Sequence, residues 1–219
     1  MAATRLVYLL PESVKTGADG NPVLRFPGGA DPFAAVQPLE ENPAQGTVEI
    51  VPRAFSPEEC ARMVHLGETG EAVAGTTEKA TGHRSSNITW IQPGSESKWL
   101  YHRIGLLILR TNQRYRFDLA GLAEPLQYAD YGEGGHFDWH TDLGVQGTSG
   151  RKLSLTIQIS APDSYDGGAL EFISVKRLPI PRELGTAVLF PSYLTHRVAP
   201  VTRGRRRSLV AWAYGPSLR

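Results

Sequence analysis

The sequence is poor in cysteine, in long apolar runs and in net charge, and each shortage excludes a class of protein. The single cysteine among 219 residues, Cys60, cannot form a disulfide within the chain and is expected to be a small buried residue of a helix. The apolar run from Leu6 to Leu10 ends at Pro11 and is too short for a membrane span or the core of a signal peptide. We therefore expect a protein of the reducing cytoplasm with no membrane partner.

The two signs of charge nearly cancel, with 23 lysine and arginine residues against 22 aspartate and glutamate residues. No overall field would attract nucleic acid or an anionic membrane, so a small-molecule or peptidyl substrate is the expected partner. The length and the 41% hydrophobic content suffice for the core of one domain over residues 1–219. A monomer or a homodimer is the expected state.

The first 50 residues are expected to form a loop-rich arm with short strands. Residues 12–46 are dense in glycine, proline, aspartate and asparagine, which favour turns over continuous helix or strand. The runs RLVYLL (5–10) and TVEIVPRAF (47–55) flank this stretch, and either could join the edge of a sheet. The arm resembles no segment that we can name.

A helical support region is expected over residues 53–115. Ser56 can cap a helix, Pro57 suits its first turn, and Glu59 completes a capping box, so a helix should run to about residue 66. A second helix is expected from about 97 to 111, because its apolar residues recur every three or four positions. Those residues are Leu100, Ile104, Leu107 and Ile108. Both helices should pack against a sheet.

From residue 125 to 214 the sequence changes to short apolar or alternating runs separated by glycine and proline turns. Examples are RKLSLTIQIS (151–160), GTAVLFPS (185–192) and RRSLVAWAY (206–214). Many short strands with regularly spaced turns are typical of a barrel or a jelly roll rather than of alternating βαβ units. We therefore predict a mainly β (α+β) fold, in which helices from the N-terminal half pack on a double-stranded β-helix.

The stretch YGEGGHFDWHTD (131–142) contains side chains suited to binding a metal ion. Alternate residues of a strand share a face, so His140 and Asp142 would point the same way, and His196 follows 56 residues after His140 in another β-like run. Two imidazoles and one carboxylate are the ligand set of non-haem iron(II) sites that leave coordination positions open. His136 and Asp138 form an overlapping HxD pair, and the spacing alone does not choose between the two pairs.

An arginine at a fixed offset supports the metal hypothesis. Arg206 lies ten residues after His196, and Ser208 would share its strand face. A guanidinium matches a carboxylate through two parallel hydrogen bonds, and a hydroxyl adds a donor, so a dicarboxylate cosubstrate would fit there. The neighbouring arginines at 203, 205 and 207 are interpreted as a solvated basic turn.

These motifs together resemble the catalytic core of iron(II)- and 2-oxoglutarate-dependent dioxygenases, in particular the prolyl 4-hydroxylase-like branch. The family spacing Y-x-x-G-x-[YF]-x-x-H-x-D is met best with His140 and Asp142 as ligands, which demotes His136. By the same resemblance His196 is the distal ligand, and Arg206 binds 2-oxoglutarate where collagen-type enzymes have lysine. The resemblance covers residues 125–214, and SPEEC and HRSSNITWI extend it weakly toward residue 53.

The resemblance also indicates further pocket residues. The polar face of strand 151–160, opposite a face of leucine and isoleucine, should line the cosubstrate pocket, so Gln158 and Thr156 are candidates, and Tyr131 is another. Where several relatives read GGEL, this chain has Ala169 after its two glycines, which removes a carboxylate near the pocket mouth. Arg84 and Trp139 are candidates for the substrate side.

The expected function is hydroxylation of an unactivated C–H bond, with release of succinate and CO2 and with ascorbate as a reductant. The sequence leaves two alternatives open. A zinc hydrolase could use the same three ligands, but it would leave Arg206 and Ser208 without a purpose. A non-catalytic jelly-roll binding module would use the histidines and the aspartate structurally. The sequence does not separate free amino acids, peptidyl residues, including proline, and small natural products as substrates.

Overall fold

The computed structural model describes residues 12–29, 42–70, 72–74, 83–173 and 180–216, and the chain divides into two compact units, 1–43 and 44–219. In the first unit β1 (Ser13–Thr16) and β2 (Pro22–Arg25) form an antiparallel hairpin, followed by a 3-10 turn, η1 (Pro27–Gly29). The run expected as a strand at 5–10 lies outside the described residues. The extent of a single domain over 1–219 stays a prediction.

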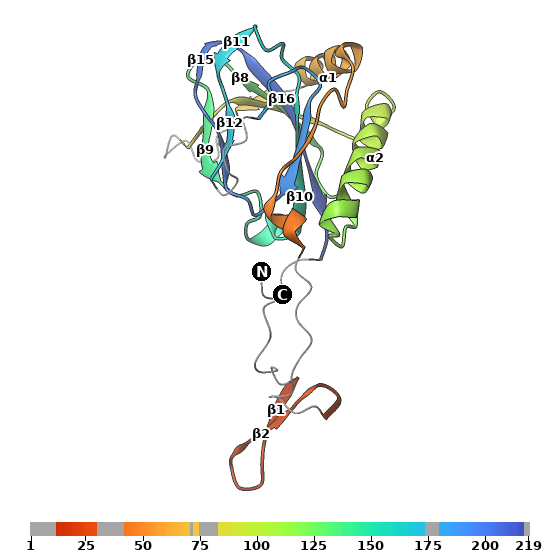
Figure 1. Ribbon diagram of the computed structural model, residues 1–219, viewed down its shortest axis with the longest axis vertical. Coiled ribbons are helices and arrows are strands. Elements are labelled where there is room, and N and C mark those ends of the chain that lie inside the picture. The colour runs from red at the N-terminus through yellow and green to blue at the C-terminus, as the bar shows by residue number, and fades with distance from the viewer. Residues whose placement is uncertain (1–11, 30–41, 71, 75–82, 174–179, 217–219) are drawn as a thin grey trace. The chain divides into compact units, whose positions relative to one another are not determined.

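In the described part of the second unit, a larger and a smaller antiparallel sheet face each other, and α1 (Pro57–Thr69) and α2 (Lys98–Tyr115) lie on the outside of the larger one (Figure 1). The order in the larger sheet is β3, β13, β10, β16, β8, β6 and β4, and β7 pairs with the end of β16. In that order the strands are Glu49–Val51, Ala187–Pro191, Arg151–Gln158, Arg206–Tyr214, Leu126–Tyr131, Asn87–Ile91 and Ala72–Ala74, with β7 at Gly121–Leu122.

The smaller sheet has the order β12, β14, β9, β5, and a separate pair joins β11 to β15. These strands are Leu170–Phe172, His196–Val198, His136–His140 and Arg84–Ser85, then Tyr165–Gly167 and Val201–Gly204. Two further 3-10 turns are η2 (Pro43–Gly46), where the second unit begins, and η3 (Gln146–Thr148). The predicted mainly β fold with a jelly-roll core is confirmed.

Helix α1 (Pro57–Thr69) begins as the sequence predicts. The Ser56 hydroxyl accepts a hydrogen bond from the Glu59 backbone N–H at 3.2 Å, and the Glu59 carboxylate accepts one from the Ser56 N–H at 2.9 Å. The helix extends three residues beyond the predicted end and buries Cys60. It lies close to the sheet at Gly67, where an added Cβ would be 2.3 Å from the Tyr128 ring.

Helix α2 (Lys98–Tyr115) covers the predicted segment and one further turn. Its buried face includes Leu100, Ile104 and Ile108, three of the four apolar residues that indicated a helix. It ends where Arg116 adopts a left-handed conformation (φ 56°) and donates its N–H to the carbonyl of Asn112. The ion pair between Arg103 and Glu59 links α2 to α1.

The core between the helices and the larger sheet depends on strict alternation along β10. Its apolar face, with Leu153, Leu155 and Ile157, packs in the main hydrophobic cluster together with residues of both helices. Burying side chains of this size contributes about 1.5–3 kcal/mol each. The opposite face, with Ser154, Thr156 and Gln158, therefore turns toward the smaller sheet.

The segment expected as helical support also contributes strands. Residues 87–91 (NITWI) alternate β-branched and aromatic side chains, and as β6 they pair with β8 in the larger sheet. Strand β5 extends the smaller sheet beside β9. This region therefore contributes strands to both sheets as well as the two helices that pack on the larger sheet.

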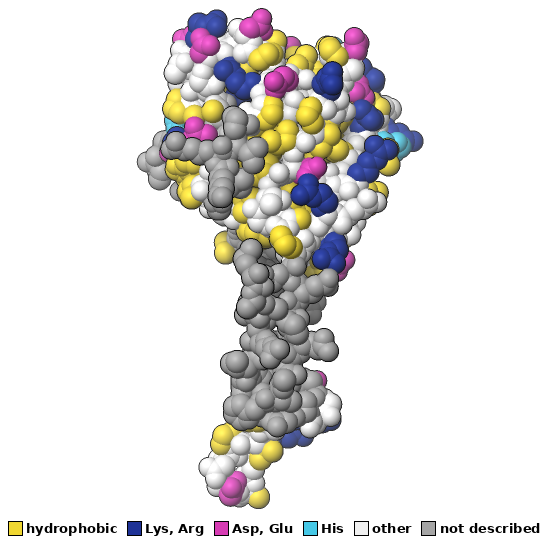
Figure 2. Space-filling view, viewed as in Figure 1, with side chains coloured by type: hydrophobic (Ala, Val, Ile, Leu, Met, Phe, Trp, Pro, Cys, Tyr) yellow, Lys and Arg dark blue, Asp and Glu magenta, His cyan; other side chains and the backbone are white. Residues whose placement is uncertain are grey.

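Acidic and basic side chains are interspersed over the visible face of the second unit (Figure 2). This distribution agrees with the near balance of charges in the sequence. Within the described ranges, no helix combines the length and the apolar character needed to span a bilayer.

Candidate active site

Strand pairing in the smaller sheet brings the two candidate histidines together. In the register of β9 with β14, His140 lies directly opposite His196, although 56 residues separate them in the chain. The centroids of the two imidazole rings are 4.2 Å apart. Phe137 stacks on the His140 ring at 3.6 Å, which limits its rotation.

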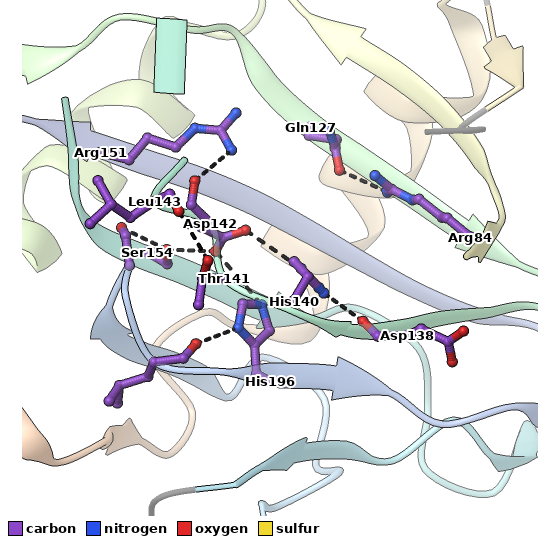
Figure 3. Close-up of polar contacts among 12 residues, drawn as sticks. Arg84, Gln127, Asp138, His140, Thr141, Asp142, Leu143, Arg151, Ser154 and His196 are labelled. Atoms are coloured by element: carbon purple, nitrogen blue, oxygen red, sulfur yellow. Dashed lines mark hydrogen bonds and ion pairs between the residues drawn. The ribbon is translucent and has the colours of Figure 1, made fainter. Parts of the chain in front are cut away.

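Asp142 completes the cluster from just beyond the end of β9. Its carboxylate oxygens lie 3.6 Å from the Nε2 atom of His140 and 3.7 Å from that of His196, and the three side chains point toward one another (Figure 3). The strand ends at His140, so Asp142 reaches this position from a bend rather than from the extended strand that the sequence predicted. A hydrogen bond from the Leu143 N–H to the Ser192 carbonyl holds that bend.

The hydrogen bonds of both histidines leave their Nε2 atoms available. The Nδ1 atom of His140 lies 2.7 Å from the Asp138 carbonyl oxygen, and that of His196 lies 2.9 Å from the Leu194 carbonyl oxygen. A carbonyl only accepts, so each Nδ1 carries a hydrogen, and a neutral ring then presents an Nε2 lone pair. This is the arrangement that orients a metal-binding imidazole.

The electrostatics of the cluster favour neutral imidazole and ionised carboxylate. Burial lowers the pKa of His196, and the effect outweighs the opposing influence of Asp142. Burial alone would raise the pKa of Asp142, but His196, His140 and the Ser154 hydroxyl together hold it well below its usual range. A divalent cation requires both of these protonation states.

Arg206 lies in the same cavity, on the larger sheet. Its side chain is 1% exposed, with Nη1 donating to the Ser208 hydroxyl at 3.2 Å and Nη2 donating to the Gln158 side-chain oxygen at 3.1 Å. The Tyr131 ring centroid is 5.5 Å from Cζ. Among the described residues Arg206 has no carboxylate partner, and its buried Nε–H has no acceptor.

Close packing at Gly168 shapes the surroundings of Arg206. This glycine has a left-handed backbone (φ 60°), and an added Cβ would lie 2.8 Å from the Arg206 side chain. Glycine therefore permits both the turn and the close approach of the guanidinium stem.

Strand β10 supplies further polar groups, as its predicted alternation indicates. Thr156 lines the cavity with Tyr131, Arg206 and Ser208, and Gln158 bonds to Arg206. Ser154 was not singled out by the sequence, although it shares this face, and its hydroxyl donates to the Asp142 carboxylate at 2.6 Å. Position on the polar face was the signal that could have identified it.

The two candidates for the substrate side lie in different places. Arg84 lines the cavity and bonds to Gln127 (Figure 3). Trp139 does not line it, and packs instead under the guanidinium of Arg197 at 4.6 Å. Because Trp139 directly precedes His140 on β9, it projects from the opposite face of the sheet.

The competing HxD pair does not join a ligand cluster within the described residues. Asp138 is exposed, and the Nδ1 atom of His136 lies 2.9 Å from the Gly134 carbonyl oxygen. The candidate ligand atoms of His140, Asp142 and His196, by contrast, all lie within 4.8 Å of one another.

The residues present fit an iron(II) ion and 2-oxoglutarate. Nitrogen and oxygen ligands lie about 2.0–2.2 Å from a divalent transition metal, so spacings of 3.6 and 3.7 Å suit atoms around one ion. The buried guanidinium of Arg206, which has no carboxylate partner among the described residues, and the adjacent Ser208 hydroxyl match a carboxylate.

Comparisons with known proteins agree with this chemistry. A family model described as 2OG-Fe(II) oxygenase superfamily matches residues 126–214. A PKHD-type hydroxylase of Bordetella pertussis is 33% identical over 171 residues, which cover 72% of this chain and 74% of that protein. A PKHD-type hydroxylase of Hyphomonas neptunium is 39% identical over 100 residues, which are 41% of this chain and 45% of that protein.

Solved structures share the fold. A prolyl-4-hydroxylase of Pseudomonas putida has a TM-score of 0.63 at 20% identity, covering 78% of this chain and 93% of that one. A prolyl hydroxylase from Trichoplax adhaerens, in complex with a peptide fragment of hypoxia inducible factor, has a TM-score of 0.64 at 18% identity, covering 78% and 84%. The chain therefore belongs to the 2OG-Fe(II) oxygenase superfamily, as an oxygenase related to PKHD-type hydroxylases and with the fold of prolyl 4-hydroxylases.

Proposed function

We propose that this oxygenase hydroxylates an unactivated C–H bond of an amino-acid-like, peptidyl or small-molecule substrate. Iron(II) would be held by His140, Asp142 and His196, and 2-oxoglutarate by Arg206 and Ser208. The observation that carries the proposal is that one cavity holds both a metal-ligand cluster and a buried guanidinium to which no described carboxylate pairs. When bound, the metal and cosubstrate supply an oxidation in which one oxygen atom of O2 enters the substrate and the other enters succinate, as 2-oxoglutarate loses CO2.

The protein's own residues bind and orient the cosubstrate. Arg206 and Ser208 would donate hydrogen bonds to its far carboxylate, while Gln158 accepts a hydrogen bond from the guanidinium and the Tyr131 ring packs against it. Thr156 adds a hydroxyl to the wall between this end and the metal ligands. A geometry that is set before binding limits the orientations available to the reacting groups.

Other residues hold the metal ligands and keep water out. The Ser154 hydroxyl donates a hydrogen bond to one carboxylate oxygen of Asp142, and the Phe137 ring stacks on one face of the His140 ring. The apolar side chains of Leu170, Phe190 and Val198 line the cavity. Exclusion of water strengthens the electrostatic interactions within the site.

Membership in an oxygenase family favours this proposal over the zinc hydrolase and the non-catalytic module. The fold shared with the Trichoplax prolyl hydroxylase, which was solved with a peptide fragment, supports a peptidyl substrate. Ascorbate as reductant and a cytoplasmic location belong to the proposal as well.

Succinate formation tests the proposed function. Purified protein would be supplied with iron(II), ascorbate and 2-oxoglutarate, with a panel of free amino acids and proline-containing peptides. His140→Ala should abolish succinate formation, whereas His136→Ala, from the competing HxD pair, should retain it. Circular dichroism would confirm that both variants are folded. Wild-type turnover in His140→Ala would show that the ligand assignment is wrong.

A further inference from the structure

Arg84 is a second guanidinium at the site cavity, and neutral groups alone hold it. Its Nε–H donates to the Ser86 hydroxyl at 2.9 Å, its Nη2 donates to the Gln127 side-chain oxygen at 2.9 Å, and its Cζ lies 4.5 Å from the Phe137 ring centroid. No described carboxylate pairs with it. The guanidinium is therefore fixed in place while its charge stays unbalanced.

Other arginines of the same unit show that this state is not general. Each of several arginines on the sheets and helices pairs with a carboxylate within 4 Å: Arg103, Arg151, Arg197, Arg203 and Arg207. The cavity, by contrast, is lined by two arginines without such a partner among the described residues, Arg84 and Arg206. The proposed function already gives Arg206 to 2-oxoglutarate.

The strand register separates the two cavity arginines. Arg206 is opposite Tyr131, and Val210 is opposite Gln127, so the residue that holds Arg84 is four positions along β8 from the neighbour of Arg206. At about 3.3 Å per residue, the backbone positions of Tyr131 and Gln127 on β8 are roughly 13 Å apart. A short diacid held at Arg206 and extending to the metal ligands leaves Arg84 free for a different molecule.

A donor without an acceptor among the described residues lies on the same part of the wall. The Trp212 side chain is 6% exposed and lines the cavity, and among the described residues its indole N–H has no acceptor. It follows Val210 by two residues on β16, so it faces the cavity beyond the position of Gln127. Buried donors are normally paired, and an unpaired one indicates a missing acceptor.

The charges of the cavity lead to the same conclusion. Arg84 and Arg206 contribute two positive charges and Asp142 one negative charge. A divalent cation and doubly ionised 2-oxoglutarate cancel each other, so the loaded site keeps one excess positive charge, next to the Arg84 end. An anionic group on the substrate would neutralise it.

We propose that the substrate carries a carboxylate, which Arg84 binds through its guanidinium and to which the Trp212 N–H donates. The inference rests on the proposed function and narrows its substrate class. The carboxylate would be that of a free amino acid or that of an acidic residue in a peptide. Gln127 acts as a positioning residue that holds Arg84 without neutralising it.

The test compares matched compounds that differ in this charge alone. Free L-amino acids would be assayed against their carboxamides, beginning with L-proline and L-prolinamide. Capped proline-containing peptides would be assayed in pairs with aspartate or asparagine beside the proline. The readouts are succinate formation and a hydroxylated product in the mass spectrum. We expect at least about a tenfold higher kcat/KM for the carboxylate member, mostly through KM. A preference in the first kind of pair identifies the carboxylate as that of a free amino acid, and a preference in the second identifies it as that of an acidic residue in a peptide.

Two variants assign the preference to Arg84. Arg84→Gln removes the charge, and Gln127→Glu keeps Arg84 but supplies an internal carboxylate partner with almost no change in shape. Both should reduce the preference to about threefold or less. Arg62→Gln is the matched control, because Arg62 also stacks on an aromatic ring, Trp99 at 4.0 Å, but does not line the cavity.

The outcomes separate the two proposals. Succinate formation with equal use of carboxylates and amides, or a preference that survives in both variants, would overturn the role of Arg84 and leave the proposed function intact. No succinate from wild-type protein under any condition would refute the proposed function, and the inference with it.

Discussion

Replacing Ser154 by alanine should weaken metal binding without affecting the 2-oxoglutarate end of the cavity. The Ser154 side chain is fully buried, and its hydroxyl donates to the Asp142 carboxylate at 2.6 Å while lying 2.9 Å from the Ser192 hydroxyl. Alanine leaves one oxygen of a buried carboxylate without its donor. The orientation of Asp142 between the two histidines then depends on fewer contacts.

The magnitude follows from the strength of such a bond. A hydrogen bond to a charged group contributes about 1.5–3 kcal/mol, and each 1.4 kcal/mol or so is a factor of about ten in a dissociation constant. The Kd for the metal should therefore rise about 10- to 100-fold. Loss of a side chain that hydrogen-bonds to a metal ligand usually has an effect of this size. Part of the lost free energy will appear as a lower free energy of unfolding of the metal-free protein, because the hydrogen bond from Ser154 to Asp142 is present there too.

Titration of metal-free protein with Mn(II), which does not oxidise readily, would measure the Kd for wild type and variant. Ser192→Ala is the matched control, since it removes the neighbouring hydroxyl but leaves the bond from Ser154 to Asp142. We expect little change in that control and an unchanged KM for 2-oxoglutarate in both variants. An unaltered Kd in Ser154→Ala, or an equal loss in both variants, would refute the reasoning.

Three other predictions concern the cosubstrate, the packing and the pH range. Arg206→Met should raise the KM for 2-oxoglutarate about 100-fold with a smaller effect on kcat, and unchanged steady-state kinetics would contradict its role. Gly67→Ala should destabilise the protein by about 1–3 kcal/mol in chemical denaturation, because the new Cβ would lie 2.3 Å from the Tyr128 ring; Gly105→Ala, with nothing within 4 Å of its Cβ, should not. Burial raises the pKa of Cys60 to about 11, from 9.0, and that of Tyr128 to about 12, from 10.0. The unfolded chain therefore releases these protons first. The stability linked to the Cys60 thiol is fully present below pH 9 and is lost as the pH rises toward 11, and that linked to the Tyr128 hydroxyl is fully present below pH 10 and is lost as the pH rises toward 12. A Tm that stays constant across that range would be inconsistent with these shifts.

Local patterns in the sequence predicted the parts of the fold that depend on neighbouring residues. The capping box at Ser56 located the start of α1, and the apolar spacing located α2 to within four residues at its end. Alternation along residues 151–160 predicted which face of β10 would turn toward the cavity. The same alternation could have excluded Trp139, which is adjacent to His140 and so lies on the other face of its strand.

Contacts between distant segments could not be predicted in this way. The hydrogen bond from Arg84 to Gln127 joins residues 43 positions apart, and it links β5, which pairs with β9 in the smaller sheet, to β8 in the larger one. The bond from Ser154 to Asp142 depends on the bend after β9, where the sequence suggested a continuous strand. Such contacts are set by strand register and side-chain rotamers, which periodicity does not specify.

The buried guanidinium of Arg206 has a consequence for the protein before any cosubstrate binds. A positive charge that is 1% exposed and lacks a described carboxylate partner is unfavourable by several kcal/mol, because the neutral contacts with Ser208 and Gln158 only partly replace its hydration. Activity and resistance to unfolding therefore make opposite demands at this position. A hydrophobic residue of similar length would give a more stable protein that binds 2-oxoglutarate weakly, and 2-oxoglutarate, by neutralising the charge, should stabilise the folded wild-type protein as well as react in it.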